Sequence, residues 1–538
     1  MAAITQNSQE VPVKIVGSSM FGRYQTISSE RTYNMFISQS GDKQEEWLVN
    51  FPGYDASVEL LATGQEGRGG FHSVRGGFII AVVSENVYKI NDALDAQIIG
   101  TLLTTEGEVF IDENLSSQIS IVDGSNVYIY NHETDDFAIG TLTNPPGGSF
   151  DPADLVPNYV TYQNTYFIFG NALTTNAGSQ WFVFQKGAGN TELDWVQTLT
   201  LQTKPDFAKA ALRIPGKGNN ILVLGSTVAE IWTNVGGVQV YQRNSSVNID
   251  YGCISVATIA ASDEIVAWLA INENSTPAIM VMSGGGAQLL STDGINHLLQ
   301  NIQFPSESTA LLYRQDGHLF YQLTFFNEVD NLTIIYDFTT NRFFDLTDWD
   351  FSYHPARQIV FYNNKTYFIS IKNGFLYETS SDITYYGQNA NVDDIKAIPR
   401  VRVCDTFRLQ RPEKFRVNLF TFVIESGTTP NAYNYQVCNG FILTQDTNVP
   451  ILTEITDVPI LVEGAYCTTG KPKVAVTISK NGGITFSNAV DYTLKATGQY
   501  RNQPRFSRLG VCSQLTIQMR FWGLGRFVVK NGVIEVSQ

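Results

Sequence analysis

The chain has 538 residues, and its 35 Lys and Arg against 51 Asp and Glu give it a formal net charge of −16 at pH 7. A chain this acidic lacks the positive surface from which proteins gain most of their affinity for phosphates, which excludes a general nucleic-acid-binding protein. Hydrophobic residues make up 43% and aromatic residues 12% of the chain, which excludes disorder, and the length predicts about two to four domains.

The N-terminal segment and the cysteines predict a soluble protein made in the cytoplasm. Residues 1–20 hold no basic stretch followed by an apolar core, so we expect no signal peptide. No run reaches the roughly 18 to 20 apolar residues of a membrane helix, so we expect no membrane partner. The five cysteines are odd in number and far apart, which favours free thiols over a zinc site or a disulfide framework. Whether Cys438 and Cys467 pair stays open.

Two strand-like runs open the chain. Residues 33–38 (YNMFIS) and 47–54 (WLVNFPGY) are separated by a charged turn, and no catalytic motif lies near them. The second run ends in a predicted structural turn at Phe51, Pro52 and Gly53. Proline fixes its own φ and glycine permits a reversal, so this turn is expected to take the chain from one strand into the next module.

A strand–turn–strand unit recurs through the middle of the chain. Each copy joins an apolar or aromatic strand to a second strand rich in Tyr, Phe, Val and Ile through a Gly, Asn or Asp turn. The seven pairs lie at 76–91, 117–131, 164–185, 219–234, 264–286, 318–338 and 364–380. Their start-to-start spacing of roughly 40 to 56 residues is the period of a four-stranded propeller blade, whose apolar faces are buried by stacking around an axis.

This period predicts an all-β protein with a six- or seven-bladed β-propeller over 61–385. Residues 1–60 are expected to be N-terminal strands that lead into it. A β-sandwich is the alternative, but it would show an even strand spacing of about 8 to 12 residues without a longer period. Helical periodicity is nearly absent, and the best candidates for helices are 206–213 and 294–300.

The pattern changes near the end of the propeller. After a polar crossover at 381–400, the strands become longer and alternate sharply, as in KVAVTIS at 473–479. Residues 386–538 are therefore predicted to form a β-sandwich-like C-terminal domain. Within it, 426–470 is predicted to be a long insertion with a candidate hairpin of its own.

One acidic run bears on catalysis. DLTDWD at 345–350 brings Asp345, Asp348 and Asp350 together, and two carboxylates that flank a sugar bond can hydrolyse it. The simpler interpretation is an acidic turn between two strands of an acidic protein, because spacing alone does not show that these carboxylates converge on a substrate.

The other motifs do not support catalysis. SKNGGITFS at 479–487 resembles the Asp-box of sialidases, with Asn481 in place of the Asp, and predicts a β-hairpin without a catalytic role. The five histidines are isolated, and no HExxH, Walker or GxSxG motif occurs. We therefore expect no enzyme, and no catalytic residue, metal site or cofactor.

Basic residues gather in the C-terminal part of the chain. The candidates for docking are Arg400, Arg402, Arg408, Arg411, Lys414, Arg416, Arg505 and Arg508. One interpretation is a solvated strand face. The other is that a basic end domain in an otherwise acidic chain docks onto the acidic surface of a partner or of another copy.

Three motifs follow one another along the chain. An early strand and its turn contain Asn34-Met35 and Phe51-Pro52-Gly53. A central Gly-Ser-x-x-x-Glu-x-aromatic strand and a late Arg-x-x-Arg-x-Gly segment contain Gly225, Ser226, Glu230, Trp232, Arg505, Arg508 and Gly510. In this order the motifs resemble those of the packaged-DNA stabilisation or tail-hub (head-closure) proteins of short-tailed bacteriophages. The resemblance spans most of the chain, which is longer than typical members.

The resemblance implies a virion protein of the phage tail that is made and assembled in the host bacterial cytoplasm. It implies a ring of copies, expected to be a hexamer, below the portal and adaptor proteins of the head-to-tail connector. The ring would close the channel after genome packaging and anchor tail fibres or spikes and a central plug protein. Packaged DNA would slide along an acidic wall without specific binding. A strand near the N-terminus that pairs with the last blade would close the propeller.

Two other functions stay open. A receptor-binding or scaffold propeller module would form no stable complex with a portal or adaptor. A carbohydrate-active propeller enzyme would depend on Asp345, Asp348 or Asp350.

Overall fold

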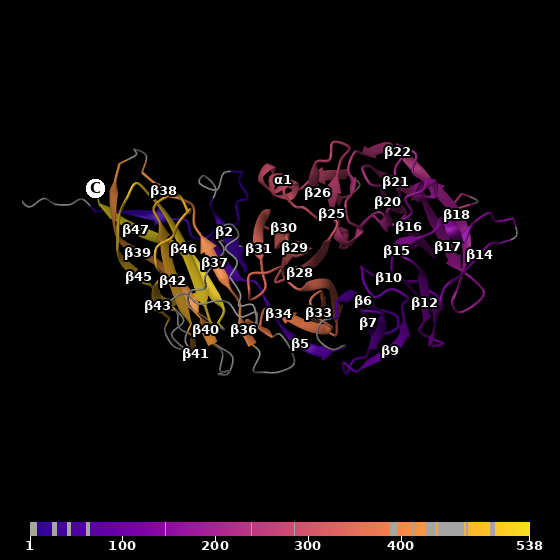
Figure 1. Ribbon diagram of the computed structural model, residues 1–538, viewed down its shortest axis with the longest axis horizontal. Coiled ribbons are helices and arrows are strands. Elements are labelled where there is room, and N and C mark those ends of the chain that lie inside the picture. The colour runs from indigo at the N-terminus through magenta and orange to yellow at the C-terminus, as the bar shows by residue number, and fades with distance from the viewer. Residues whose placement is uncertain are drawn as a thin grey trace, which may run out of the picture.

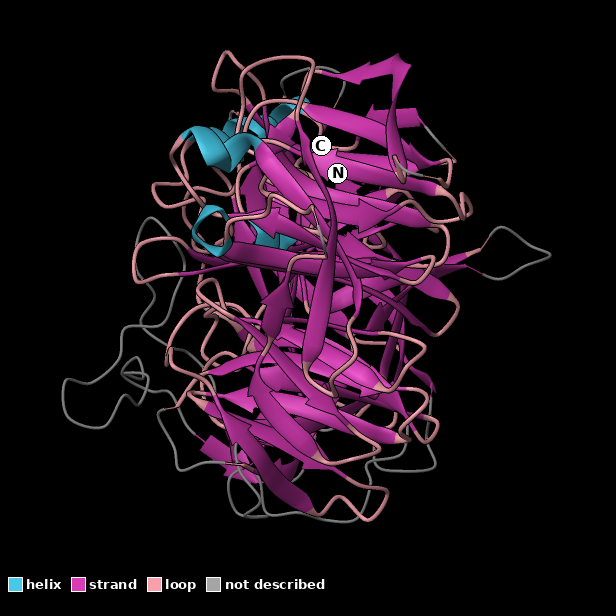
Figure 2. Cartoon of the chain, turned by 90° about the vertical axis from the view of Figure 1, so that its right-hand side faces the viewer, coloured by secondary structure: helices cyan, strands magenta, loops and turns pink. Residues whose placement is uncertain are grey.

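The computed structural model describes residues 8–23, 29–39, 45–60, 65–145, 147–237, 239–284, 286–387, 395–409, 413–426, 436–438, 467–469, 472–494, 501–523 and 525–537. Strands dominate this part of the chain (Figure 1, Figure 2). Its one α-helix is α1 (Asp293–Gln300), beside the short 3₁₀ turns η1 (Pro152–Asp154), η2 (Asn176–Ser179) and η3 (Val256–Thr258). A sandwich and a propeller lie at opposite ends of the long axis (Figure 1).

Seven sheets, blades 1 to 7 in chain order, form the propeller within the described residues. Blades 1 to 3 contain β6 (Gly67–Ser73), β7 (Phe78–Val83), β8 (Asn86–Ile90) and β9 (Ala96–Thr101); β10 (Phe110–Glu113), β11 (Gln118–Val122), β12 (Val127–Asn131) and β13 (Asp136–Ile139); and β15 (Pro157–Gln163), β16 (Tyr166–Asn171), β17 (Gln180–Lys186) and β18 (Glu192–Thr200), with β14 (Thr141–Thr143) beside β18. Blades 4 and 5 contain β19 (Ala210–Arg213), β20 (Asn220–Leu224), β21 (Ala229–Asn234) and β22 (Tyr241–Ile249); and β23 (Gly252–Cys253), β24 (Ala260–Ala261), β25 (Ile265–Ile271), β26 (Pro277–Ser283) and β27 (Gly286–Leu289). Blades 6 and 7 contain β28 (Ser308–Gln315), β29 (His318–Phe326), β30 (Asn331–Asp337) and β31 (Arg342–Leu346); and β32 (Ala356–Tyr362), β33 (Lys365–Ser370), β34 (Phe375–Ser380) and β5 (Gly53–Glu59).

The blades are arranged in a closed ring. The innermost strand β10 contacts both β6 and β15, and β32 of blade 7 contacts β6 of blade 1. The seven predicted strand pairs are the second and third strands of the seven blades, and β7, β11 and β12 are buried along their whole length. The fold is therefore the predicted propeller, with seven blades rather than six.

Strand β5 closes the ring from the N-terminal side. It is the outermost strand of blade 7 and pairs antiparallel with β34. The preceding strand, β4 (Glu46–Asn50), lies in the sandwich, so the turn at Phe51 and Pro52 takes the chain from one domain into the other. Gly53 does not adopt a left-handed conformation. Glycine is required there for space, because a Cβ atom would lie 2.0 Å from the carbonyl oxygen of Tyr385.

The sandwich consists of two sheets, and the N-terminal strands belong to both. The first sheet contains β1 (Ser8–Val13), β3 (Met35–Gln39), β4, β39 (Phe415–Ser426), β44 (Arg501–Asn502), β45 (Arg505–Cys512) and β47 (Phe527–Ser537). The second contains β2 (Arg31–Tyr33), β37 (Arg400–Val403), β38 (Phe407–Arg408), β42 (Lys473–Ser479), β43 (Val490–Thr493) and β46 (Gln514–Trp522). Alternate residues of the two sheets face each other, and Phe420, Ile424, Val476 and Ile517 are among those that form the core between them.

Blade 6 and the second sandwich sheet form one continuous sheet of ten strands. Strand β31 of blade 6 pairs in parallel with β2 through Asp345 and Tyr33. Phe320 of blade 6 also packs against Phe36 and Phe51 in the core that the sandwich shares. A movement of the propeller against the sandwich would therefore break a sheet and open a hydrophobic core.

One of the two helix predictions is right. Helix α1 covers 294–300. Its N-cap is Thr292, whose side chain accepts a hydrogen bond from the amide of Ile295. The prediction at 206–213 is wrong, because 210–213 form β19, the innermost strand of blade 4, which pairs with β20. Pairing within the blade outweighs the local preference for a helix.

Most of the predicted insertion at 426–470 lies outside the described residues. The exceptions are Ser426 at the end of β39, and the strands β40 (Gln436–Cys438) and β41 (Cys467–Thr469). These two strands pair antiparallel with Cys438 opposite Cys467 in the backbone register. Strands β35 (Tyr385–Gly387) and β36 (Ile395–Ala397) follow blade 7 beside β5. No helix among the described residues is long and apolar enough to cross a membrane.

Candidate docking surfaces

The predicted docking residues divide into a buried pair and an exposed group. The buried pair is Arg400 and Arg402 on β37, which are 1% and 0% exposed. The guanidinium of Arg402 donates hydrogen bonds to the carbonyl oxygens of Ile15 (2.7 Å) and Ser18 (3.0 Å). It also donates to the hydroxyl of Thr32 (3.0 Å). Arg402 thus holds the segment between β1 and β2 on the sandwich.

Arg400 has a similar structural role. Its guanidinium donates to the carbonyl oxygens of Gly523 (3.0 Å) and Thr384 (3.1 Å) and lies over the ring of Phe527. All four residues of β37 are buried, so both faces of this strand are covered by other elements, and side chains that a sequence pattern would place outside are buried. The prediction of a docking role is therefore wrong for Arg400 and Arg402.

The exposed group lies at one edge of the first sandwich sheet. We call Lys414, Arg416, Lys480, Arg505 and Arg508 the basic patch; all five are exposed. Arg408 on β38 is exposed nearby, and Arg411 lies outside the described residues. Within the described part of the chain, no member of the patch forms an ion pair with an acidic residue. The positive charge of the patch is therefore not balanced by ion pairs with acidic residues in the described part of the chain.

The fold brings the patch together from three segments. Strands β39 and β45 pair so that Arg416 is opposite Val511. The side chain of Lys480, after β42, lies against Gly510 on β45, where it occupies the space beside the glycine. Lys480 could not be predicted as a member of the patch from the sequence, because no spacing relates it to the arginines and only the packing of the β42–β43 turn on β45 places it there.

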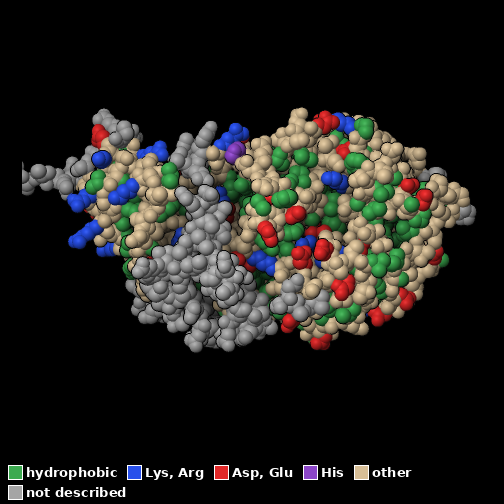
Figure 3. All heavy atoms as spheres, viewed as in Figure 1, with side chains coloured by type: hydrophobic (Ala, Val, Ile, Leu, Met, Phe, Trp, Pro, Cys, Tyr) green, Lys and Arg blue, Asp and Glu red, His purple; other side chains and the backbone are tan. Residues whose placement is uncertain are grey.

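Charge is divided between the two ends of the molecule. Residues 395–538 contain 17 Lys and Arg against 9 Asp and Glu, although the chain as a whole is acidic. Blades 1 and 2, residues 67–139, contain 3 Lys and Arg against 11 Asp and Glu. Figure 3 shows Lys and Arg side chains gathered at the sandwich end and Asp and Glu side chains spread over the propeller.

The acidic run at 345–350 is part of the framework. Asp345 is 4% exposed and accepts two hydrogen bonds from the guanidinium of Arg31 (3.0 and 2.7 Å) and one from the hydroxyl of Ser19 (2.5 Å). Arg31 lies on β2 and Asp345 on β31, so this pair spans the junction at which blade 6 joins the sandwich. Its carboxylate has no open position for a substrate.

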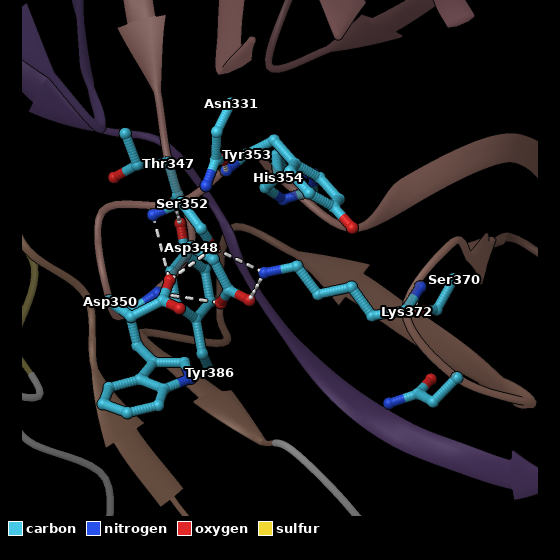
Figure 4. A network of polar contacts seen from close by, with 12 residues as sticks. Asn331, Thr347, Asp348, Asp350, Ser352, Tyr353, His354, Ser370, Lys372 and Tyr386 are labelled. Carbon is cyan, nitrogen blue, oxygen red and sulfur yellow. Dashed lines mark hydrogen bonds and ion pairs between the residues drawn. The ribbon is translucent and has the colours of Figure 1, made fainter. Parts of the chain in front are cut away.

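Asp348 and Asp350 belong to a second network, drawn in Figure 4. Asp348 accepts hydrogen bonds from the phenol of Tyr54 (2.6 Å) and the ammonium of Lys372 (2.6 Å). Lys372 also donates to the hydroxyl oxygen of Ser352 (2.6 Å), and that hydroxyl donates to Asp350 (2.5 Å). The network joins the loop between blades 6 and 7 to β5 and to the turn between β33 and β34.

A serine beside a lysine can be a nucleophile and its base, but the electrostatics here oppose that chemistry. Burial alone lowers the pKa of Lys372, but the carboxylates of Asp348 and Asp350 outweigh it and raise the pKa above its ordinary value. The amine is therefore protonated at neutral pH and cannot accept the proton of Ser352. Ser352 is also only 8% exposed. The arrangement supports a structural network rather than an active site.

The lowered pKa of His354, which lies beside this network, predicts that the stability of the protein depends on pH. Burial, with the nearby ammonium of Lys372, lowers its pKa from 6.5 to about 3. Below pH 6.5 the unfolded chain binds a proton there that the folded chain does not, so stability falls as the pH drops. At about pH 5 we expect this loss to reach about 2 kcal/mol and to be absent from the His354→Gln variant. Urea unfolding at neutral and acidic pH measures it, and identical pH dependence in both proteins would contradict it.

Glu230, in the central Gly-Ser-x-x-x-Glu-x-aromatic motif, also has a structural role. It is 0% exposed and accepts hydrogen bonds from the amides of Gln202 (2.8 Å) and Thr203 (2.5 Å) and from the indole of Trp232 (3.0 Å). It therefore fixes the connection between blades 3 and 4 against β21.

The Asp-box-like segment forms the connection of a β-hairpin, as predicted, because β42 pairs antiparallel with β43. Asn481 accepts a hydrogen bond from the amide of Thr485 (3.0 Å) and donates one to its hydroxyl (2.8 Å). Ser479 accepts from the amide of Gly483 (2.9 Å). Gly482 and Gly483 have φ values of 78° and 90°, which glycine adopts without strain. Asn481 thus replaces the usual aspartate within the turn.

The propeller axis contains a cavity of about 690 Å³. Its lining includes Gly70, Asp112, Tyr159, Arg213, Ala260, Leu312 and Gln358, one from each blade. Burial raises the pKa of Asp112, and Arg213 lies 3.9 Å from its carboxylate. Among the described residues, no group of three or more His, Cys, Asp or Glu side chains is placed to hold a metal ion.

Solved structures resemble this chain only weakly. A streptogramin B lyase has 9% identity and a TM-score of 0.38, covering 61% of this chain and 97% of its own. The WD40 propeller domain of Doa1 has 14% identity and a TM-score of 0.37, with coverage of 61% and 97%. The designed protein Ika8 has 12% identity and a TM-score of 0.35, with coverage of 64% and 92%. Such values say nothing about the activity of this chain.

A family model gives a clearer result. No curated protein matches the chain, but residues 32–384 match the model of the phage stabilisation family, described as bacteriophage P22 Gp10, beta-propeller. The matched residues run from β2 through the seven blades and cover more than half of the chain, whereas the basic patch lies beyond them. The chain therefore belongs to the phage stabilisation family of β-propeller proteins that is described for Gp10 of bacteriophage P22.

Proposed function

We propose that this chain is a structural virion protein that serves as a tail hub. A ring of copies, expected to be a hexamer, joins the portal and adaptor to the distal tail. It closes the channel after the genome is packaged and anchors fibres or spikes and a central plug. The observation that carries this proposal is the family match across the propeller, joined to a sandwich whose exposed basic patch has no acidic partner within the described chain.

The connections between the two domains support a role that requires rigidity under mechanical force. The ten-stranded sheet, the Arg31–Asp345 pair and the ring closure by β5 all connect the propeller to the sandwich. A connector under the pressure of packaged DNA needs such rigidity. The acidic propeller suits a surface past which DNA slides without sticking, because like charges repel.

Catalysis is not part of the proposal. The three aspartates that favoured a carbohydrate-active enzyme are held in hydrogen bonds, and two of them, Asp345 and Asp348, are almost fully buried. A receptor-binding module remains the competing function.

Electron microscopy of particles made without this chain tests the proposal. We expect heads that have lost their packaged DNA and that lack a tail below the portal. Particles with complete tails that fail only to adsorb to the host would show a receptor-binding module instead.

A further inference from the structure

Exposed apolar side chains lie beside the basic patch. Val511 on β45 is 52% exposed and pairs with Arg416, and Ile484, four residues after Lys480, is 66% exposed. Large apolar side chains beside uncompensated charges are typical of surfaces that bind another protein. The patch therefore offers both a charge and a hydrophobic contact to a partner.

A second exposed surface has the opposite charge. Three large apolar side chains occupy one end of adjacent blades: Phe361 in blade 7 (60% exposed), Val74 in blade 1 (77%) and Leu115 in blade 2 (63%). We call these three, with the exposed residues Asp92, Asp95, Glu133 and Asp135, the acidic face.

The topology places the members of the acidic face together. In an antiparallel blade, the turn after the first strand and the turn after the third strand lie at the same end. Val74 and Leu115 lie in turns of the first kind, and the acidic residues in turns of the second kind. Asn363 in blade 7 donates a hydrogen bond to Asp92 in blade 1 (3.2 Å), and the rings of Phe78 and His132 join blades 1 and 2.

We propose that the basic patch of one copy docks onto the acidic face of the next copy. A closed ring requires two different surfaces on each copy, one for each neighbour. The two surfaces lie on different domains, the basic patch on the sandwich and the acidic face on blades 7, 1 and 2 of the propeller (Figure 1), and no ion pair joins them within the described residues. This inference rests on the ring proposed above and identifies the surfaces that build it.

Charge complementarity favours a second copy over an unrelated partner. The five basic side chains meet no acidic residue within their own described chain, and the acidic face supplies four carboxylates on a region with 11 Asp and Glu against 3 Lys and Arg. Burial of Val511 and Ile484 against Phe361, Val74 and Leu115 adds a hydrophobic contact. Such an interface weakens as salt screens its charges.

Charge-reversed variants of the full-length protein test this interface. The Arg416→Glu/Arg505→Glu variant reverses part of the basic patch, and the Asp95→Lys/Glu133→Lys variant reverses part of the acidic face. All four side chains are exposed, so folding is expected to persist, and thermal unfolding checks it. The matched control Lys14→Glu/Lys217→Glu reverses two exposed lysines outside both surfaces.

Sedimentation velocity at low and high ionic strength gives the readout. We expect the unchanged protein and the control to self-associate at low salt, and each charge-reversed variant to associate about a hundredfold more weakly. Mixing the two variants is expected to restore association, because each supplies the surface that complements the reversed surface of the other.

Three outcomes would overturn the inference: a monomeric unchanged protein at low salt, variants that associate as well as the control, or a mixture that stays monomeric. Binding of the basic patch to a different acidic protein would appear as variants that form rings normally but fail in particle assembly. None of these results decides the tail-hub function, which is judged by the particles made without the chain.

Discussion

Replacing Asn34 by Ala is expected to destabilise the protein by about 3–5 kcal/mol. Asn34 is 0% exposed and has a φ of 56°, a conformation that asparagine tolerates better than alanine. Its amide group donates to the hydroxyl of Thr347 (2.8 Å) and the carbonyl of Pro399 (2.8 Å), and its oxygen accepts from the amide of Thr347 (2.8 Å). One side chain thus joins β3 to the end of blade 6 and the start of β37, and alanine would leave these polar groups buried without partners.

Asn364 provides the matched control. Its φ is 60°, but its side chain is exposed and forms no hydrogen bond with any residue that the structure describes. Asn364→Ala therefore isolates the cost of the left-handed backbone, about 1 kcal/mol. Urea unfolding of both variants measures the difference. Equal losses at the two positions would show that the hydrogen bonds of Asn34 contribute nothing.

Gly53→Ala is expected to disrupt the closure of the propeller ring. The added Cβ would meet two backbone carbonyl oxygens, that of Tyr385 at 2.0 Å and that of Ile383 at 2.9 Å. Backbone atoms cannot rotate away as side chains do, so β5 must shift from β34 or from β35. Because the amide of Gly53 also donates to Ile383 (2.7 Å), we expect a loss of more than about 3 kcal/mol.

Gly218→Ala is the control for this substitution. Gly218 has open space around its Cβ position and no left-handed conformation, so alanine is expected to be neutral. Thermal unfolding gives the loss of stability, and limited proteolysis shows whether cleavage begins around β5. A Gly53→Ala protein as stable and as resistant as the control would contradict the assigned role.

The propeller could be predicted from the sequence because its signal is local and repeated. Each blade contributes one hairpin with two buried strands, such as β7 and β8, and its period is visible without knowledge of the fold. The number of blades needed the structure, because the last blade takes its fourth strand, β5, from the other end of the chain. Gly53 shows the same limit, since the backbone that crowds it lies more than three hundred residues away.

The docking surfaces could be predicted only in part. Clustering along the sequence does not distinguish exposed Arg416 and Arg505 from buried Arg400 and Arg402, because burial depends on whether another element covers that face of the sheet. Lys480 joins the patch through tertiary packing alone. The acidic face is assembled from the ends of three blades, and single residues such as Val74 carry no signal in the sequence.

Protection of the packaged genome from nuclease tests the central claim most directly. Particles assembled without this chain are treated with DNase, with and without addition of the purified protein, and the DNA that survives is measured. A tail hub that closes the channel predicts that heads package DNA and then lose it, and that the added protein restores protection. Heads that keep their DNA in the absence of the chain, and fail only to attach to the host, would contradict the account.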